Sequence, residues 1–336
     1  MGGGFNSLFH NIASVSNLLS AWKEFRKGKR KKKDVAEFEI HLEDNLFKLH
    51  EDLLNRNFKL NPYEAFSISD PKPRRIHKAS VRDRVLNQAI FRVLYPIFNK
   101  AFIYDSYSSR KGKGTHLGVH RLFSATRKVS TNWNKSSYVL KCDIEKFFDS
   151  VVHEKLISLV KRKVSDMLVL ELLEKIIRSF EKTKGRGIPL GNVTSQLFSN
   201  IYLNELDRFV KHELKARYYF RYADDFVILA QDKMLLVEYE KRIREFLERV
   251  LFLKLHDHKV EIRKVSQGID FLGYVVLPHT LALRNKTKNR ILRNLLNENK
   301  EKDEKFFQRL DSYLGVLKHC RSRATKREIF EFLVEK

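Results

Sequence analysis

Apolar residues recur at helical spacing through much of the chain. This spacing predicts helices over 14–60, 81–100 and 151–180, and again from 195 and from 285 onward. In the first two stretches, the apolar residues expected to face a core are Leu42, Leu46, Phe47, Leu49, Leu53 and Leu54, then Val85, Ala89, Ile90, Val93, Leu94 and Ile97. Much of the predicted core is therefore helical.

Alternating patterns interrupt the helices and predict strands over 138–144, 218–229 and 268–276. In the first, Cys142 and Ile144 share a face with Leu140, whereas Lys141 and Asp143 take the other face with Val139. The prolines at 62, 71 and 73 indicate an extended segment before the second helix. Runs of strand among longer helices favour an α+β fold.

Composition narrows the class of protein. The 336 residues are 43% hydrophobic, which is enough for a sizeable core. The two cysteines, Cys142 and Cys320, are too few and too far apart for a disulfide framework or a zinc finger. No stretch approaches the ~18 apolar residues of a membrane span, and the start lacks a signal-peptide core. We expect a cytoplasmic protein with no membrane partner.

Positive charge is the strongest feature of the composition. The formal net charge is +25, which predicts a polyanionic partner, because lysines and arginines set against phosphates release condensed counterions. A merely soluble basic protein is the alternative. The predicted RNA contacts lie in a dense run and in a glycine-containing loop, at Arg26, Lys27, Lys29 and Arg30 and at Arg110, Lys111 and Lys113.

Acidic residues end two of the predicted strands. Asp224 and Asp225 lie between two β-rich runs, and Asp143 ends the strand 138–144. Adjacent carboxylates ~4 Å apart repel by roughly 1 to 4 kcal/mol, whereas a divalent cation makes the arrangement attractive. The three acids therefore predict a metal-dependent phosphoryl-transfer site. Asp143 could instead cap a helix, but Asp149 is the better candidate for that cap.

These acids lie within ordered motifs that resemble those of reverse transcriptases. The motifs are Lys141–Ser150, which resembles the first catalytic motif, Gly187–Gln196, which resembles the nucleotide pocket, Tyr222–Asp225, which resembles the Tyr-x-Asp-Asp box, and Phe271–Tyr274, which resembles the primer grip. Upstream, Val81–Val85 and Ser106–Gly114 resemble fingers motifs of the group II intron-like bacterial branch. The set implies a right-hand polymerase fold and an RNA-directed DNA polymerase, a nucleotidyltransferase.

The resemblance implies roles residue by residue. Asp143, Asp224 and Asp225, with Ile144 beside them, would hold two Mg²⁺ ions, with Mn²⁺ as a substitute, and Lys259 would protonate the leaving pyrophosphate. Lys259 could instead be an ordinary surface lysine, and Phe148 could instead be an ordinary core residue. The implied nucleotide-binding residues are Arg74, Arg75, Lys78, Phe148, Leu190, Gly191 and Gln196; the implied primer grip is Phe271, Leu272, Gly273 and Tyr274.

The pocket motif also indicates a branch of the family. Leu190 stands where most reverse transcriptases have Gln, and Gln196 where they have Pro, which resembles the enzymes of diversity-generating retroelements. That branch implies a bacterial, archaeal or phage origin and cDNA with errors at template adenines that enters a target gene by retrohoming. It also implies a small basic oligomeric accessory protein as a partner, beside template RNA, primer and dNTPs. The alternatives are a group II intron-like or defence-type enzyme and, in another class, a catalytically idle RNA-binding scaffold.

The same resemblance divides the chain into regions. We expect a basic helical region over 1–60, fingers over 61–135, a palm with an antiparallel sheet over 136–277, and a helical thumb over 278–336. A helical insertion over 151–186 is expected to interrupt the palm.

Overall fold

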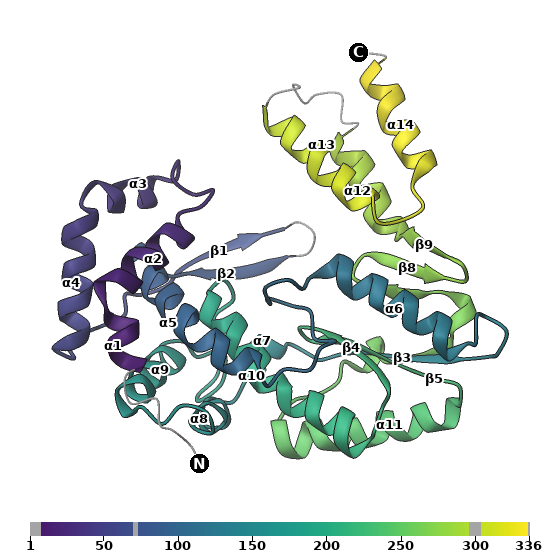
Figure 1. Cartoon of the computed structure of the whole chain (residues 1–336), viewed down its shortest axis with the longest axis horizontal. Coiled ribbons are helices and arrows are strands. Elements are labelled where there is room, and N and C mark those ends of the chain that lie inside the picture. The colour runs from purple at the N-terminus through teal and green to yellow at the C-terminus, as the bar shows by residue number, and fades with distance from the viewer. Residues whose placement is uncertain (1–7, 70–72, 296–303, 335–336) are drawn as a thin grey trace. The chain divides into compact units, whose positions relative to one another are not determined.

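The computed structural model describes residues 8–69, 73–295 and 304–334 (Figure 1). Pro71 of the predicted extended segment lies outside them. The chain divides into two compact units, each built from separate stretches of sequence. The first consists of Met1–Ile103, Ile144–Phe209 and Arg244–Lys254; the second consists of Tyr104–Asp143, Val210–Ile243 and Leu255–Lys336. The predicted regions do not correspond one to one to these units, and their boundaries stay predictions.

The first unit is helical around α5, which packs against α1, α2 and α10. Ser80 caps α5 by accepting a hydrogen bond from the Asp83 amide, so the predicted helix begins where its sequence indicates. A two-stranded antiparallel hairpin, β1 and β2, precedes α5. The elements are α1 (Leu8–Ala13), α2 (Val15–Phe25), α3 (Lys33–Ile40), α4 (Leu42–Leu54), β1 (Glu64–Ile68), β2 (Arg74–Lys78), α5 (Val81–Asn99), α7 (Phe147–Ser150), α8 (His153–Lys161), α9 (Met167–Arg178), α10 (Val193–Arg208) and the π-helical turn Leu247–Leu251.

Some of the core positions predicted from periodicity are wrong. On α4, Leu46, Leu49 and Leu53 are buried, but Phe47 and Leu54 are 53% and 43% exposed. Both exposed residues lie on α4 itself, each one position after a buried leucine and so about 100° around the helix from it, outside the buried stripe of Leu46, Leu49 and Leu53.

The second unit is built on a four-stranded antiparallel sheet in the order β4-β5-β3-β6. A second sheet has the order β7-β8-β9; its third strand was not predicted. The elements are α6 (Thr115–Val129), β3 (Tyr138–Asp143), the π-helical turn Phe209–Glu213, β4 (Tyr218–Tyr222), β5 (Asp225–Ala230), α11 (Lys233–Phe246), short 3-10 turns at Asp257–Lys259 and Val265–Gln267, β6 (Glu261–Lys264), β7 (Ile269–Phe271), β8 (Tyr274–Leu277), β9 (Thr280–Leu283), α12 (Asn285–Leu295), α13 (Glu304–Leu317) and α14 (Arg323–Val334).

Helix α6 packs against β4, β5 and β8, so one core joins both sheets of this unit. Leu122 of α6, Val227 of β5 and Phe271 of β7 are buried in it. Helices α12 to α14 form a smaller apolar cluster of their own. The predicted α+β class with antiparallel sheets is confirmed. None of the described helices is both long and apolar enough to cross a membrane.

The predicted helix cap at Asp149 is wrong. Asp149 lies inside α7, which starts after Lys146 in a left-handed conformation (φ 43°). The next helix, α8, begins after Val152 without a side-chain cap. Because Asp143 precedes both helix starts without capping either, its carboxylate remains available for another role.

Candidate active site

Three acids meet at one end of the four-stranded sheet. Asp143, the last residue of β3, is the direct cross-strand partner of Asp225, the first residue of β5. Residues opposite each other in an antiparallel pair project to the same face with Cβ atoms ~5 Å apart. Asp224 lies in the two-residue turn before Asp225, next to Ala223. The structure thus brings together the three acids that the sequence singled out.

The environment of Asp225 disfavours its negative charge. Its Oδ1 is shielded from solvent and has no hydrogen-bond partner. Burial, together with the nearby charges of Asp143, Asp224 and Asp270, raises the pKa of Asp225 to about 7, although Lys141 acts in the opposite direction. A buried carboxylate oxygen without a partner costs free energy, so a site of this kind favours a cation.

Two lysines flank the acids. Lys259 Nζ donates to Asp143 Oδ1 at 2.9 Å, so this predicted catalytic lysine does lie at the site. Lys141 shares the face of β3 that carries Asp143, and its Nζ donates to the Asp270 carbonyl at 2.7 Å. The two-residue period placed Lys141 on the face of Asp143, but sequence reasoning gave Lys141 no role at the site and missed Asp270.

The chemistry of these donors fits a hard divalent cation, because carboxylate oxygens are its preferred protein ligands. The orphaned Oδ1 of Asp225 supports that fit. Within the described residues, no group of three or more His, Cys, Asp or Glu side chains is already arranged to hold a metal ion. The buried Ile144 side chain is a hydrocarbon with no ligand atom, so only its main-chain carbonyl could contribute.

The nucleotide-pocket motif packs on β2 within the first unit. The His77 amide donates to the Leu190 carbonyl at 3.1 Å. Gly191 has φ 126°, and a Cβ there would lie 3.2 Å from Ile76 Cγ2, so the position requires glycine. Leu190 and Gly191 are thereby brought beside the strand that carries Arg74, Arg75 and Lys78, whereas Gln196 is exposed in the first turn of α10.

The two adjacent phenylalanines have different surroundings. Phe147 is buried against Tyr202, with ring centroids 6.3 Å apart. Phe148 is half-buried, and its carbonyl accepts a hydrogen bond from the Ile188 amide of the pocket motif at 2.9 Å. Phe147 is therefore the core residue, and Phe148 retains an accessible ring surface beside the motif.

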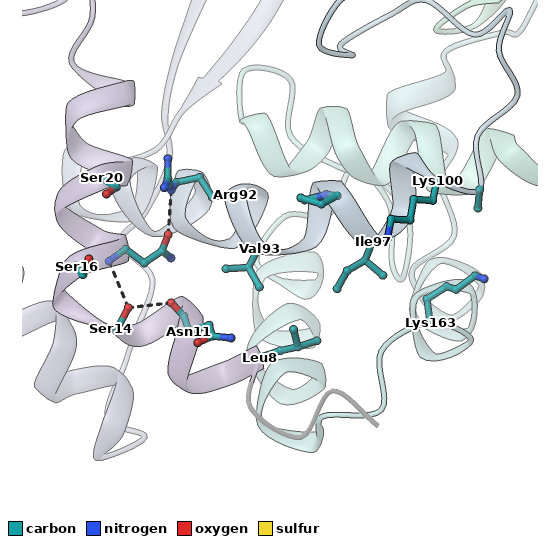
Figure 2. Close-up of a pocket in the computed structure, with 13 residues that line it drawn as sticks. Leu8, Asn11, Ser14, Ser16, Ser20, Arg92, Val93, Ile97, Lys100 and Lys163 are labelled. Atoms are coloured by element: carbon teal, nitrogen blue, oxygen red, sulfur yellow. Dashed lines mark hydrogen bonds between the residues drawn. The ribbon is translucent and has the colours of Figure 1, made fainter. Parts of the chain in front are cut away.

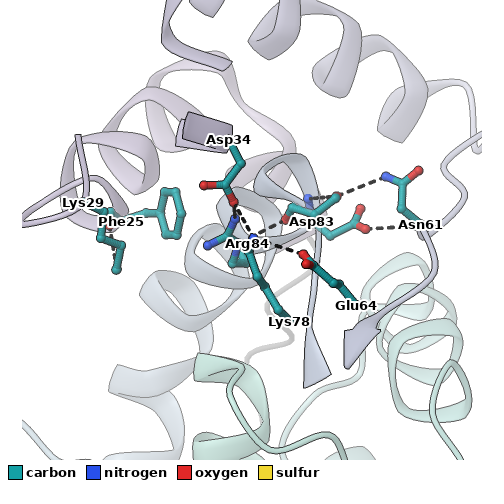
Figure 3. Close-up of polar contacts among 9 residues, drawn as sticks. Phe25, Lys29, Asp34, Asn61, Glu64, Lys78, Asp83 and Arg84 are labelled. Carbon is teal, nitrogen blue, oxygen red and sulfur yellow. Dashed lines mark hydrogen bonds and ion pairs between the residues drawn. The ribbon is translucent and has the colours of Figure 1, made fainter. Parts of the chain in front are cut away.

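The structure distinguishes among the candidate phosphate-gripping cations of β2. Lys78 Nζ lies 3.0 Å from Asp34 and 3.1 Å from Glu64, and Arg84 Nη2 lies 2.5 Å from the same Asp34 oxygen (Figure 3). Although burial opposes it, hydrogen bonding to Lys78 and Arg84 lowers the pKa of Asp34. Arg74 and Arg75 are exposed and make no ion pair within the described parts of the chain.

The basic run of the N-terminal helices is partly neutralised from within. Glu39 on α3 pairs with Arg26 and, at 3.0 Å, with Arg30. These contacts, led by the Arg30 hydrogen bond, lower the pKa of Glu39. Lys29 Nζ donates to the Phe25 carbonyl at 2.7 Å and lies 4.5 Å from the Phe25 ring centroid. Among the predicted contacts of this run, Lys27 alone has no ion pair or hydrogen bond of its side chain with the described residues.

The other predicted contacts belong to the second unit. In the loop at 106–114, Arg110 Nη1 donates to the Ser106 carbonyl at 2.8 Å, and Lys113 Nζ lies 3.1 Å from the Tyr104 ring centroid; Lys111 is exposed. The predicted primer-grip residues form a tight hairpin between β7 and β8. Leu272 and Gly273 at its tip have φ 54° and 86°, the two positive values expected of a type I′ turn.

A separate groove of about 850 Å³ lies in the first unit, among α1, α2 and α5 (Figure 2). Val93 and Ile97, assigned by periodicity to the buried side of α5, line this groove instead. Lys100 and Lys163 also line it, whereas Arg92 is held by Asn17 Oδ1 at 3.0 Å. The groove contains no carboxylate, so it offers no alternative metal site.

Comparisons with known proteins show which family the chain resembles. A family model described as reverse transcriptase (RNA-dependent DNA polymerase) matches residues 68–276. The chain is 27% identical over 266 residues to protein YkfC of Escherichia coli, covering 67% of this chain and 69% of that protein. It is 22% identical over 325 residues to the group II intron-encoded protein LtrA of Lactococcus lactis, covering 74% of this chain and 53% of that protein.

Similarity among solved structures concerns the fold alone. Telomerase from Candida albicans, solved in complex with a fragment of telomeric RNA, matches with a TM-score of 0.50 and 12% identity. The match covers 85% of this chain and 61% of that one. The chain thus spans only part of the relatives it matches, about half of LtrA and three fifths of the telomerase chain. The telomerase match confirms the expected polymerase fold.

Proposed function

The chain belongs to the family of reverse transcriptases, which are RNA-directed DNA polymerases, and we propose that it makes cDNA from a template RNA at the acids of β3 and β5. The observation that supports this site best is the cross-strand pair of Asp143 and Asp225, with Asp224 in the adjoining turn and one carboxylate oxygen left without a partner. A scaffold that only binds RNA gains nothing from acids placed where a polyanion must approach.

Asp143, Asp224 and Asp225 would hold the Mg²⁺ ions, proposed to number two, with the Ile144 carbonyl alongside. When bound, divalent cations supply activation of the primer 3′-hydroxyl and neutralise charge on the leaving pyrophosphate. Lys259 Nζ donates a hydrogen bond of 2.9 Å to Asp143 Oδ1 and is the proposed proton donor to that leaving group. Phe148 would exclude the 2′-hydroxyl of a ribonucleotide, and the hairpin Phe271–Tyr274 would hold the primer end.

We also propose that the enzyme is error-prone, as in diversity-generating retroelements. The Leu190 side chain can contact a base pair but offers it no hydrogen bond, and an apolar wall discriminates by only ~1–3 kcal/mol. Template adenines would be the positions most often miscopied, and the mutated cDNA would diversify a target gene with the help of a basic accessory protein. The similarity to LtrA favours the alternative, a group II intron-like enzyme.

Primed cDNA synthesis by the purified protein on a defined RNA with Mg²⁺ tests the activity. Wild type is expected to make cDNA and Asp224→Asn to lose about 100-fold or more, because the metal loses a charged ligand. If Asp224→Asn made as much cDNA as wild type, the proposed site would be wrong. If wild type made no cDNA even with template RNA and accessory protein supplied, the alternative of a catalytically idle RNA-binding scaffold would be favoured.

Sequencing the products tests the branch. Errors concentrated opposite template adenines support the diversity-generating assignment, and evenly scattered or rare errors support the intron-like alternative. Leu190→Gln restores a hydrogen-bonding side chain at the pocket wall and is expected to lower the adenine error rate. An unchanged error spectrum in Leu190→Gln would contradict the proposed cause of infidelity.

A further inference from the structure

The turn that carries Asp224 has an unfavourable backbone. Ala223, directly before Asp224, has φ 53°, in the left-handed region that residues with a Cβ rarely adopt. Such a conformation persists only where surrounding contacts enforce it. Because the dihedral angles of Ala223 set the direction in which the chain enters Asp224, whatever enforces them also places that carboxylate.

Arg221 supplies an enforcing contact. Its side chain is completely buried, and Nη1 donates a hydrogen bond of 3.1 Å to the Ala223 carbonyl. A guanidinium is a charged, planar donor, so its hydrogen bond to the partly buried carbonyl is stronger and more directional than one between neutral groups. Arg221 lies on β4 two residues before Ala223, so its side chain reaches along its own strand to the turn.

The main chain of Arg221 is fixed as well. Its amide donates to the Asp105 carbonyl and its carbonyl accepts from the Tyr107 amide, both at 2.9 Å. The segment Asp105–Tyr107 thus pairs with β4, which is an edge strand of its sheet. Arg121 Nε donates to Asp105 Oδ1 at 3.2 Å and ties this segment to α6. Arg221 is therefore held on both sides of its backbone while its side chain holds the turn.

We propose that Arg221 is a positioning residue for catalysis: it holds the Ala223–Asp224 turn in the conformation that presents Asp224 to the metal. Arg221 would touch neither substrate nor metal and would act through the Ala223 carbonyl. The same residue joins the turn to the segment that opens the basic loop at 106–114, so the predicted template contacts and the catalytic acids share one anchor.

The test compares Arg221→Lys and Arg221→Gln with wild type, and presupposes the proposed cDNA synthesis. Lysine keeps the charge but loses the planar fork, and glutamine keeps a neutral N–H donor on a shorter side chain. Arg263→Lys on β6 of the same sheet is the matched control, because Arg263 bonds Glu261 and not the turn. Rates are measured over a Mg²⁺ titration and over a dNTP titration, with circular dichroism melting for each protein.

A positioning role predicts that a folded Arg221 variant loses about tenfold or more in kcat and requires several-fold more Mg²⁺ for half-maximal rate. Its KM for dNTP is expected to stay within about twofold of wild type, as is every parameter of Arg263→Lys. The conclusion is drawn from whichever Arg221 variant keeps the wild-type circular dichroism spectrum, because that variant is folded. A folded variant with wild-type kcat and Mg²⁺ dependence overturns the proposal, as does a loss of rate while the Mg²⁺ concentration for half-maximal rate stays at the wild-type value. Because wild type, Arg263→Lys and Asp224→Asn are assayed alongside, failure of the proposed function is seen separately.

Discussion

Charge is arranged in opposite ways in the basic N-terminal helices and at the acidic end of β3. Arg26 and Arg30 in the dense cationic run are both bonded to Glu39, so part of that charge is compensated inside the protein. Asp225, in a cluster of few residues, keeps a buried oxygen without any partner. The difference teaches that density of charge along a sequence is a weaker sign of chemistry than charge that the fold leaves uncompensated.

The largest test of this contrast is Asp225→Asn. An amide removes the repulsion from Asp143 and Asp224 but is a poor ligand for Mg²⁺, so we expect a loss of about 100-fold or more in cDNA synthesis. Without metal, the same change should raise the free energy of unfolding by about 1 kcal/mol or more, because an unpaired buried charge is gone. Denaturant unfolding with EDTA at pH 8, above the pKa of about 7, measures it.

Asp257→Asn, at an exposed aspartate near Lys259, is the control and should be stable and active to within about 0.5 kcal/mol of wild type. If Asp225→Asn proved less stable than wild type without metal, the acidic end of β3 would not be a strained site, and the contrast with the basic helices would fail.

Among cations, the same contrast separates Lys78 from its neighbours on β2. Lys78 is paired with Asp34 and Glu64, whereas Arg74 and Arg75 are exposed without ion pairs in the described structure. We expect Arg74→Gln or Arg75→Gln to raise the KM for dNTP by about tenfold, the value of one charged hydrogen bond. Lys78→Gln should change it by about threefold at most. Steady-state kinetics on a fixed primer and template measure all three. A largest effect at Lys78 would mean that its ion pairs open when nucleotide binds.

Which charges find a partner in the fold could be predicted from the sequence only in part, for a physical reason. The acids could be placed because a strand period of two fixes the face of Asp143, and a two-residue turn brings Asp224 and Asp225 to the same end. The pairing of Lys78 with Asp34 depends on how α3 packs beside β2, which local patterns do not encode. The error at Asp149 is of the same kind, since α7 starts from a left-handed residue, Lys146, that carries no capping signal.

Arg221 shows most directly what sequence patterns could not predict. A charged residue in a strand would be assigned to the solvent, yet its side chain is fully buried, and the contact that gives it a role is to a carbonyl two residues away. The local pattern does not distinguish Phe147 from Phe148, although the resemblance gave a role to Phe148 alone, and packing against Tyr202 assigns Phe147 to the core.

A smaller effect should follow from restoring charge to the basic helices. Glu39→Gln releases Arg26 and Arg30 from their ion pairs, so we expect RNA to bind about threefold more tightly and with a steeper salt dependence. Glu43→Gln removes the same charge from an exposed position on α4 with no ion pair in the described structure, and should have less effect. Filter binding of single-stranded RNA at several salt concentrations gives both numbers. Equal effects of the two variants would show that only net charge matters.

The smallest expected effect concerns three neighbouring histidines that have no acidic partner in the described structure. On α6, His116 stacks on His319 with ring centroids 3.9 Å apart, and His120 Nε2 lies 3.3 Å from His319 Nδ1. Burial first, and then the neighbouring histidine, lowers the pKa of both His116 and His120 below 6.5. The unfolded chain therefore binds protons more readily, so stability present above pH 6.5 is lost as pH falls below it.

We expect the melting temperature to drop by about 2–4 °C more in wild type than in His319→Gln between pH 7.5 and 5.5. His212→Gln, at an exposed histidine, should keep the wild-type drop. If His319→Gln kept it too, the stacked rings would tolerate charge as easily as an exposed side chain does, and uncompensated positive charge would cost this protein less than uncompensated negative charge at Asp225.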